Sequence, residues 1–247
     1  MQADIDNSIL RKLDPSQSYL WKLLPSRGRS GGILSGIRVE FFNVGSFKEG
    51  KYILQLNLWD KTHKIKWNFM NVYGSPHEEN KAKFLTELAS FCGTCQDPFL
   101  AGGDFNLIRF TNEKNKSTIL SKHSGTFNSI ISCYDLLDLS LAGGRFTWSN
   151  NQASPTLVKL DRTLVSQSWE DVFPRVMVYK LPREISDHNP LILQSTQQQT
   201  MRNLSFKFEL MWLKDPDFLP LVNKIWSKPF HGDTAFDRIQ LKLKRFK

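Results

Sequence analysis

The sequence contains very little cysteine, with three residues among 247: Cys92, Cys95 and Cys133. These are too few and too unevenly spaced to form a disulfide framework. Cys92 and Cys95 form the single Cys-x-x-Cys pair, and no second cysteine pair or histidine pair follows at ligand spacing, which argues against a zinc site. Free thiols are typical of a reducing compartment. We therefore expect an intracellular protein, nuclear or cytoplasmic.

Long apolar runs are also missing. No stretch approaches the roughly 18 apolar residues that a membrane helix needs. The start of the chain, MQADIDNSILRKLD, has no apolar run of the signal-peptide type. The glycines between Gly28 and Gly36 lack the Gly-Lys-Ser/Thr ending of a nucleotide-binding loop. These absences argue against a membrane protein and against a P-loop enzyme.

Negative charge is in deficit, because 24 Asp and Glu face 33 Lys and Arg, a formal net charge of +9. Ten basic and five acidic residues lie in 200–247, so +5 of this charge belongs to the tail and +4 to the remaining 199 residues. A basic surplus favours an anionic partner such as nucleic acid. With 40% hydrophobic residues, the chain can bury one substantial core.

Hydrophobic periodicity predicts intermixed strands and helices. Residues 52–58 alternate as a strand does, and Ile65–Tyr73 would form the second strand of an antiparallel hairpin. Helical spacing predicts a helix through Phe84–Cys92 and another through Phe127–Leu137. Further strands are expected at Ile33–Val39, Pro98–Ala101, Val158–Val165, Val176–Leu181 and Pro190–Leu193. Because there is no regular βαβ alternation, we expect an α/β fold with mixed or antiparallel sheets.

The most informative stretch is Gly102-Gly103-Asp104-Phe105-Asn106, which directly follows a predicted buried strand. In an extended backbone Asp104 and Asn106 would point the same way, because side chains two residues apart share a face. Such a pair can orient a water or hold hydrated Mg²⁺ while it contacts a phosphate oxygen. The alternative is a strand-ending Asx turn, which is common and needs no chemistry.

Two further acidic motifs accompany it. Ser186-Asp187-His188 places an acid beside a histidine just before the last predicted strand, and Asp161 lies 27 positions upstream of His188. An Asp that accepts from one imidazole nitrogen leaves the other to face a phosphate. An isolated Asp-His pair is usually structural. Three such elements, each beside a strand, favour one shared phosphate site.

The order of these motifs resembles the endonuclease/exonuclease/phosphatase superfamily, which has the DNase I-like fold. The motifs are Asn71-Val72-Tyr73, Gly103-Asp104-Phe105-Asn106, Gly144-Arg145-Phe146-Thr147-Trp148, Leu160-Asp161-Arg162 and Ser186-Asp187-His188. Over roughly residues 30–194 their wording is similar to the endonuclease domain of plant non-LTR (LINE-type) retrotransposons. The resemblance implies a DNase I-like four-layer α/β sandwich with two packed mixed β-sheets, incomplete at the N-terminus.

Carried over residue by residue, the resemblance implies that Asp104 activates the attacking water and contributes to metal binding. Asn106 and Tyr73 would contact the phosphate, although a core role at the end of a hairpin fits Tyr73 equally well. Asp187 would help to bind the metal, which is Mg²⁺ in this family, with Mn²⁺ as a substitute.

The resemblance also implies that His188, oriented by Asp161, stabilises the pentavalent phosphate. Trp148 is assigned to packing rather than to stacking on DNA. The implied partner is DNA, without a membrane, together with the reverse transcriptase region of a longer parent polyprotein.

The sequence departs from the family near its N-terminus. The family's earlier strands carry an Asn and then a Glu in a Gln-Glu-Thr context, and this Glu is a principal Mg²⁺ ligand. Neither motif occurs here. Asp4, Asp6 and Asp14 lie in a stretch that is predicted to be helix or loop, so we assign none of them as the missing metal ligand. We therefore expect a truncated domain with impaired activity.

Composition changes after the polar run Gln194–Gln199. We expect residues 1–194 to form the truncated domain and 195–247 a linker and helical extension toward a missing downstream region. The extension would hold a strand at Phe206–Glu209 and a helix from Asp215-Pro216 through Trp226.

Three functions remain compatible with the sequence: a Mg²⁺-dependent DNA endonuclease, an inactive fragment that binds nucleic acid, and a phosphatase of the same superfamily. The motif wording argues against the phosphatase. The missing Glu favours the fragment for this chain, within a nuclease lineage.

Overall fold

The computed structural model describes residues 7–26, 31–195, 213 and 216–227, and the chain divides into two compact units, 1–197 and 198–247. In the second unit the structure describes one helix, α5 (Phe218–Trp226). The predicted helix start at Asp215-Pro216 is wrong, because Pro216 lies in a turn and the helix begins at Phe218. Pro220 fits there, since backbone N–H groups in the first turn of a helix have no partner within the helix. The predicted strand Phe206–Glu209 lies outside the described residues.

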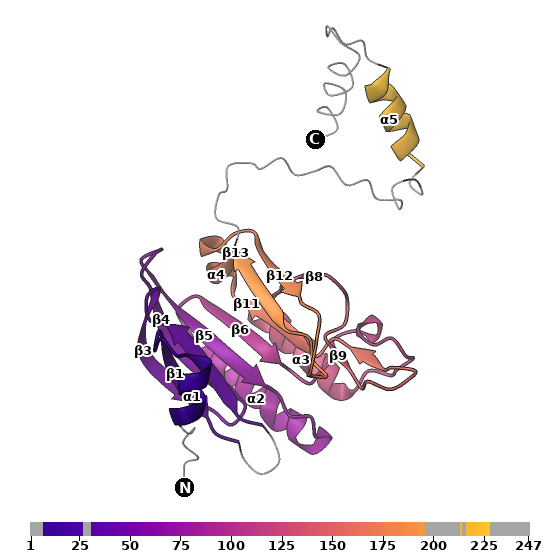
Figure 1. Cartoon of the computed structure of the whole chain (residues 1–247). Helices are drawn as coiled ribbons and strands as arrows, with labels where there is room; N and C mark the ends of the chain where they lie inside the picture. The colour runs from indigo at the N-terminus through magenta and orange to yellow at the C-terminus, as the bar shows by residue number, and fades with distance from the viewer. Residues whose placement is uncertain (1–6, 27–30, 196–212, 214–215, 228–247) are drawn as a thin grey trace, which may run out of the picture. The chain divides into compact units, whose positions relative to one another are not determined.

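A six-stranded mixed sheet forms the centre of the first unit (Figure 1). Its strand order is β3 (Phe42–Glu49), β4 (Ile53–Asp60), β5 (Ile65–Tyr73), β6 (Phe99–Asp104), β11 (Asp161–Val165) and β7 (Leu137–Asp138). The predicted hairpin is confirmed, because β4 and β5 pair antiparallel. β5 and β6 run parallel and need a crossover, which α2 (Glu78–Thr94) supplies.

Helices α2 and α3 (Lys122–Cys133) cover one face of this sheet (Figure 1). α2 buries the residues that helical spacing selects: Phe84, Leu85, Leu88, Phe91 and Cys92. α3 ends earlier than predicted. Asp135 has a φ of 48°, which ends the helical path, and Leu137 pairs with Val165 in β7 instead.

Short sheets cover the other face (Figure 1). The hairpin of β1 (Tyr19–Leu24) and β2 (Ile33–Arg38) packs its Leu24, Ile33 and Ile37 against the leucines of β4. β8 (Leu141–Ala142), β12 (Val176–Lys180) and β13 (Leu191–Ser195) form a three-stranded sheet. The remaining elements are α1 (Asn7–Leu13), a 3₁₀ turn (Thr111–Glu113), β9 (Trp148–Ser149), β10 (Leu157–Val158) and α4 (Gln167–Val172). The prediction of an α/β fold with mixed sheets is confirmed.

The predicted strand Val158–Val165 is in fact two strands. Its N-terminal part, β10, pairs with β9, whereas β11 begins at Asp161 and pairs with β6. The break arises because Thr147 Oγ1 accepts the backbone N–H groups of both Leu160 and Asp161, each at 3.0 Å. This break places Asp161 at the first position of its strand. No helix in the described part of the chain has the length and apolar character to cross a membrane.

Candidate active site

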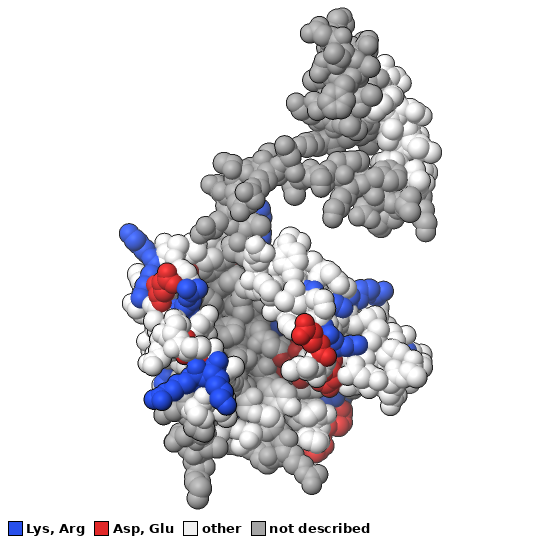
Figure 2. Space-filling view, in the orientation of Figure 1, with Lys and Arg blue, Asp and Glu red and all other residues white. Residues whose placement is uncertain are grey.

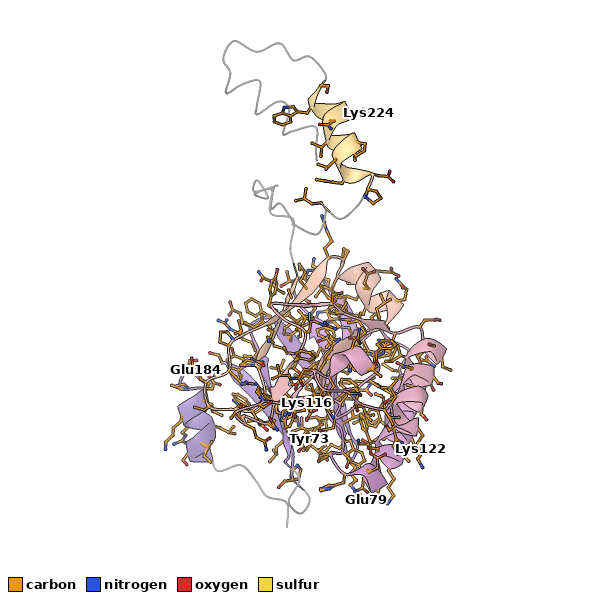
Figure 3. All side chains as sticks on the ribbon, turned by 90° about the vertical axis from the view of Figure 1, so that its right-hand side faces the viewer. Tyr73, Glu79, Lys116, Lys122, Glu184 and Lys224 are labelled. Atoms are coloured by element: carbon orange, nitrogen blue, oxygen red, sulfur yellow. The ribbon has the colours of Figure 1, made fainter. Side chains whose placement is uncertain are left out.

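Three of the predicted site residues lie at the same end of three neighbouring strands. Tyr73 ends β5, Asp104 ends β6 and Asp161 begins β11. Asp104 is the register partner of both Tyr73 and Asp161. Register partners project from the same face of a sheet, with Cβ atoms roughly 5 Å apart. The face is the one covered by the short sheets, because Tyr73 packs with the cluster that includes Leu24 and Ile33. Tyr73 is labelled in Figure 3.

The backbone after Asp104 turns sharply and brings Asn106 back to the carboxylate. Asn106 has a φ of 51°, its N–H donates to Asp104 Oδ1 at 2.8 Å, and its Nδ2 donates to Oδ2 at 2.6 Å. The expected extended backbone is therefore wrong, and the strand-ending Asx turn is the geometry observed. This turn still holds the carboxylate and the amide in contact.

Gly103 makes the approach of β6 to β5 possible. Its φ is +140°, and a Cβ at this position would lie 2.1 Å from the carbonyl oxygen of Val72. Glycine is therefore the residue that this position accepts without strain. It fixes the strand end on which Asp104 is carried.

His188 lies against Asp161, as the sequence predicts. Nδ1 of His188 is 2.9 Å from Oδ2 of Asp161, which accepts its hydrogen bond. This hydrogen bond is the main cause that raises the pKa of His188 above its usual value, while burial works against it. The side chain remains 30% exposed. Because Nδ1 is used by Asp161, Nε2 is the ring nitrogen that can contact a ligand.

The segment that carries His188 is fixed by Thr147 and Trp148. The Nε1–H of Trp148 donates to Asp187 Oδ2 at 2.8 Å, and Asn189 N–H donates to the Thr147 carbonyl at 2.7 Å. The bond from Trp148 lowers the pKa of the exposed Asp187. Trp148 therefore does more than pack, because it orients the acid beside the histidine.

Asp104 has an unusual proton affinity. Burial, followed by the charge of Asp161, raises its pKa to about 6, although the hydrogen bonds from Asn106 oppose the shift. An acid whose pKa is near the working pH is suited to accept and release a proton. Asp104 is the register partner of Asp161, which accepts from His188, and Asp187 directly precedes His188, so the four groups share one site.

The oxygen donors suit a hydrated divalent cation. Mg²⁺ is usually held through one or two carboxylates and keeps several waters. Asp104 and Asp187 supply such carboxylates, and a cation would offset the repulsion between Asp104 and Asp161. Within the described residues no three His, Cys, Asp or Glu side chains are grouped to hold a metal ion.

The sequence interpretation missed a buried cation next to the site. The Arg162 side chain is 0% exposed, and its two terminal nitrogens donate to Glu113 at 3.0 and 2.6 Å and to Asp138 at 2.8 Å. Nη2 also donates to the carbonyl of Leu107, in the loop that leaves Asn106. This network joins the strand of Asp161 to the loop after Asp104. One signal was in the sequence: Arg162 alternates with Asp161 on a strand and therefore faces the core.

Figure 2 shows that, on the face in view, the described Lys and Arg side chains of the first unit are spread over two sides rather than gathered in a single patch.

Comparisons with known proteins identify the family and the fold. A model described as the Endonuclease/Exonuclease/phosphatase family matches residues 12–188. No curated protein sequence matches the chain.

Three solved structures share the fold. The endonuclease domain of TRAS1, a telomere-specific non-LTR retrotransposon, has a TM-score of 0.57 and 11% identity, with 78% of this chain and 91% of that chain covered. A functionally unknown protein from Enterococcus faecalis V583 has a TM-score of 0.53 and 15% identity, covering 76% and 81%. D. rerio TDP2 humanized by 14 mutations has a TM-score of 0.51 and 13% identity, also covering 76% and 81%. The predicted DNase I-like fold is confirmed.

Proposed function

The chain belongs to the Endonuclease/Exonuclease/phosphatase family, and from this membership we propose that its Asp104–His188 site hydrolyses phosphodiester bonds of DNA with Mg²⁺. One observation carries the proposal: Asp104, Asn106, Asp161 and His188, which span 85 positions, meet at one end of the central sheet. A carboxylate base opposite an Asp-held imidazole is an arrangement suited to attack on a phosphate.

The side chains divide the reaction between them. Asp104, as a carboxylate, takes the proton of the attacking water, and Asn106 keeps that carboxylate oriented. As the water oxygen bonds to phosphorus, the P–O bond to one sugar oxygen breaks, and this oxygen takes up a proton from solvent. His188, protonated and held by Asp161, donates from Nε2 to a phosphate oxygen on which charge builds up. Tyr73, at the neighbouring strand end, contacts the phosphate. Asp104 and Asp187 would hold Mg²⁺, or Mn²⁺ in its place, and the ion would neutralise the negative charge of the phosphate.

We expect the activity to be low. Two carboxylates bind Mg²⁺ weakly, and in the described residues no group of three ligands is available to hold it. Because positioning contributes most of the catalysis in phosphoryl transfer, a loosely held ion should slow the reaction. If the ion is not held at all, the chain would bind nucleic acid without cleaving it, which is the alternative function.

The amino-acid sequences of the motifs and the proteins of similar structure favour DNA over a small phosphoester as the substrate. TRAS1 is a retrotransposon endonuclease, and another TDP2 structure contains single-strand DNA product. By the same argument the parent would be a retrotransposon polyprotein, with a reverse transcriptase region as partner.

Relaxation of supercoiled plasmid tests the proposal, measured over long incubations with Mg²⁺, Mn²⁺ or EDTA. The matched substrate is a soluble phosphomonoester under the same conditions. Slow nicking that needs the metal, without phosphomonoester hydrolysis, would support an endonuclease. Release of phosphate from the monoester without nicking would favour the phosphatase, and plasmid binding with neither activity would favour the inactive fragment.

A further inference from the structure

A cavity of about 280 Å³ lies beside the candidate active site. It lies between the β1–β2 hairpin, through Leu24 and Ile33, and the segment from the end of β5 to the start of α2. Ligand pockets for drug-sized molecules run from about 300 to 1,000 Å³, so this cavity suits a group the size of a nucleobase.

The cavity and the cleavage site share a wall. Gly74 lines the cavity, its N–H donates to the carbonyl of Asp104 at 2.7 Å, and its own carbonyl accepts Nδ2 of Asn106 at 3.0 Å. A Cβ on Gly74 would lie 2.3 Å from the carbonyl oxygen of Phe105, so the backbones of Gly74 and Phe105 pack directly against each other in this wall. Tyr73, labelled in Figure 3, also lines the cavity and is the register partner of Asp104. The cavity therefore adjoins the strand end that carries Asp104, through Tyr73 and Gly74.

The lining combines flat apolar surface with a few polar groups. Leu24, Ile33 and Pro76 supply the apolar surface, and the amide of Asn80 can pair with the edge of a base. The exposed Lys51 at this cavity has its Nζ 5.1 Å from the ring centroid of Tyr52. The ammonium group of Lys51 would attract the phosphate of a nucleotide bound in the cavity.

Tyr52 supplies an independent observation. This residue lines the cavity, is 7% exposed, and its buried hydroxyl has no hydrogen-bond partner among the described residues. Buried polar groups in folded proteins are nearly always paired. The hydroxyl itself is closed to the cavity, so a ligand there would meet other atoms of Tyr52.

From this placement we propose that the cavity binds the base of the nucleotide next to the cleaved phosphodiester, which would give the site a base preference. The proposal rests on the proposed function for the identity of the ligand as a nucleotide. Nucleotide binding at the cavity itself needs no metal and no cleavage, so it is measured separately.

The probes are the four deoxynucleoside 5′-monophosphates, added without metal to the full chain and followed by saturation-transfer NMR on their base protons. Gly31→Tyr adds a bulky ring to the lining of the cavity without a clash, because a Cβ on Gly31 meets nothing within 4 Å. Gly125→Tyr is the matched control, since Gly125 is an exposed glycine of α3 whose Cβ also meets nothing within 4 Å. Lys51→Ala is a second variant that keeps the backbone contacts, and thermal melting checks the folding of all three.

We expect saturation transfer from the chain to at least one base, lost in Gly31→Tyr and kept in Gly125→Tyr. Lys51→Ala should weaken binding by roughly fivefold or less, the size of one exposed ion pair. Absence of transfer to every base, or equal transfer in wild type and both the Gly31 and Lys51 variants, would overturn the proposal. If Gly31→Tyr does not fold, the Lys51 variant decides. Base binding without any nicking would refute the cleavage function and leave the cavity assignment standing.

Discussion

Replacing Arg162 by Ala should cost the first unit a large part of its stability. The side chain is 0% exposed, and its removal leaves Glu113 and Asp138, each 9% exposed, without their main cation. Removing one partner of a buried ion pair costs about 3–5 kcal/mol in free energy of unfolding. Domains of ordinary stability have about 5–15 kcal/mol in total.

Urea denaturation of the full chain, followed by tryptophan fluorescence, measures this change. With an m value of about 2 kcal/mol/M, the expected shift of the midpoint is about 2 M. Arg145→Ala is the matched control, because Arg145 is exposed and donates to the carbonyl of Asn112, and it should change stability by about 0.5 kcal/mol or less. A shift for Arg162→Ala no larger than that of the control would refute the argument that this buried network holds the strand and loop of the site together.

Three further outcomes follow from the same geometry. Plasmid nicking should fall as pH rises through the raised pKa of His188, because the imidazole loses its charge there; nicking that does not fall up to pH 9 would exclude His188 as the donor. Asp161→Asn should move the falling limb to lower pH, since the amide removes the negative charge and weakens the hydrogen bond that raises the His188 pKa; an unmoved limb would show that Asp161 does not control the charge of His188. In thermal melting, Gly103→Ala should lose about 1–3 kcal/mol from backbone strain, and more from its clash with Val72. Gly125→Ala on α3 should gain about 0.5–1 kcal/mol, and similar results for the two variants would contradict the strain argument.

Strongly periodic elements were predictable from the sequence because their burial follows from local spacing. β5 has the predicted bounds, and α2 buries the five residues that helical periodicity selects. The errors arise where backbone groups find partners far away in the sequence. Thr147 breaks the strand before Asp161, and Asp135 ends α3 before Leu137. Neither event leaves a periodic signal.

The residues of the candidate site were predictable from the sequence, but the hydrogen bonds that orient them were not. Motif order placed Asp104, Asp161 and His188 together, and the structure brings them together. Their roles in catalysis stay predictions. The turn at Asn106 and the bond from Trp148 to Asp187 depend on tertiary contacts that residue spacing does not encode.

Comparison of two histidine variants in plasmid nicking tests the central claim most directly. His188 and His63 each place Nδ1 against an aspartate, at 2.9 Å from Asp161 and 2.8 Å from Asp60. The two variants therefore remove the same kind of pair, but the first lies at the proposed site and the second in the β4–β5 turn. With Mg²⁺ or Mn²⁺, His63→Ala should nick at the wild-type rate, whereas His188→Ala should lose about 100-fold or more. Equal nicking by both variants would contradict the assignment of this site to phosphodiester cleavage.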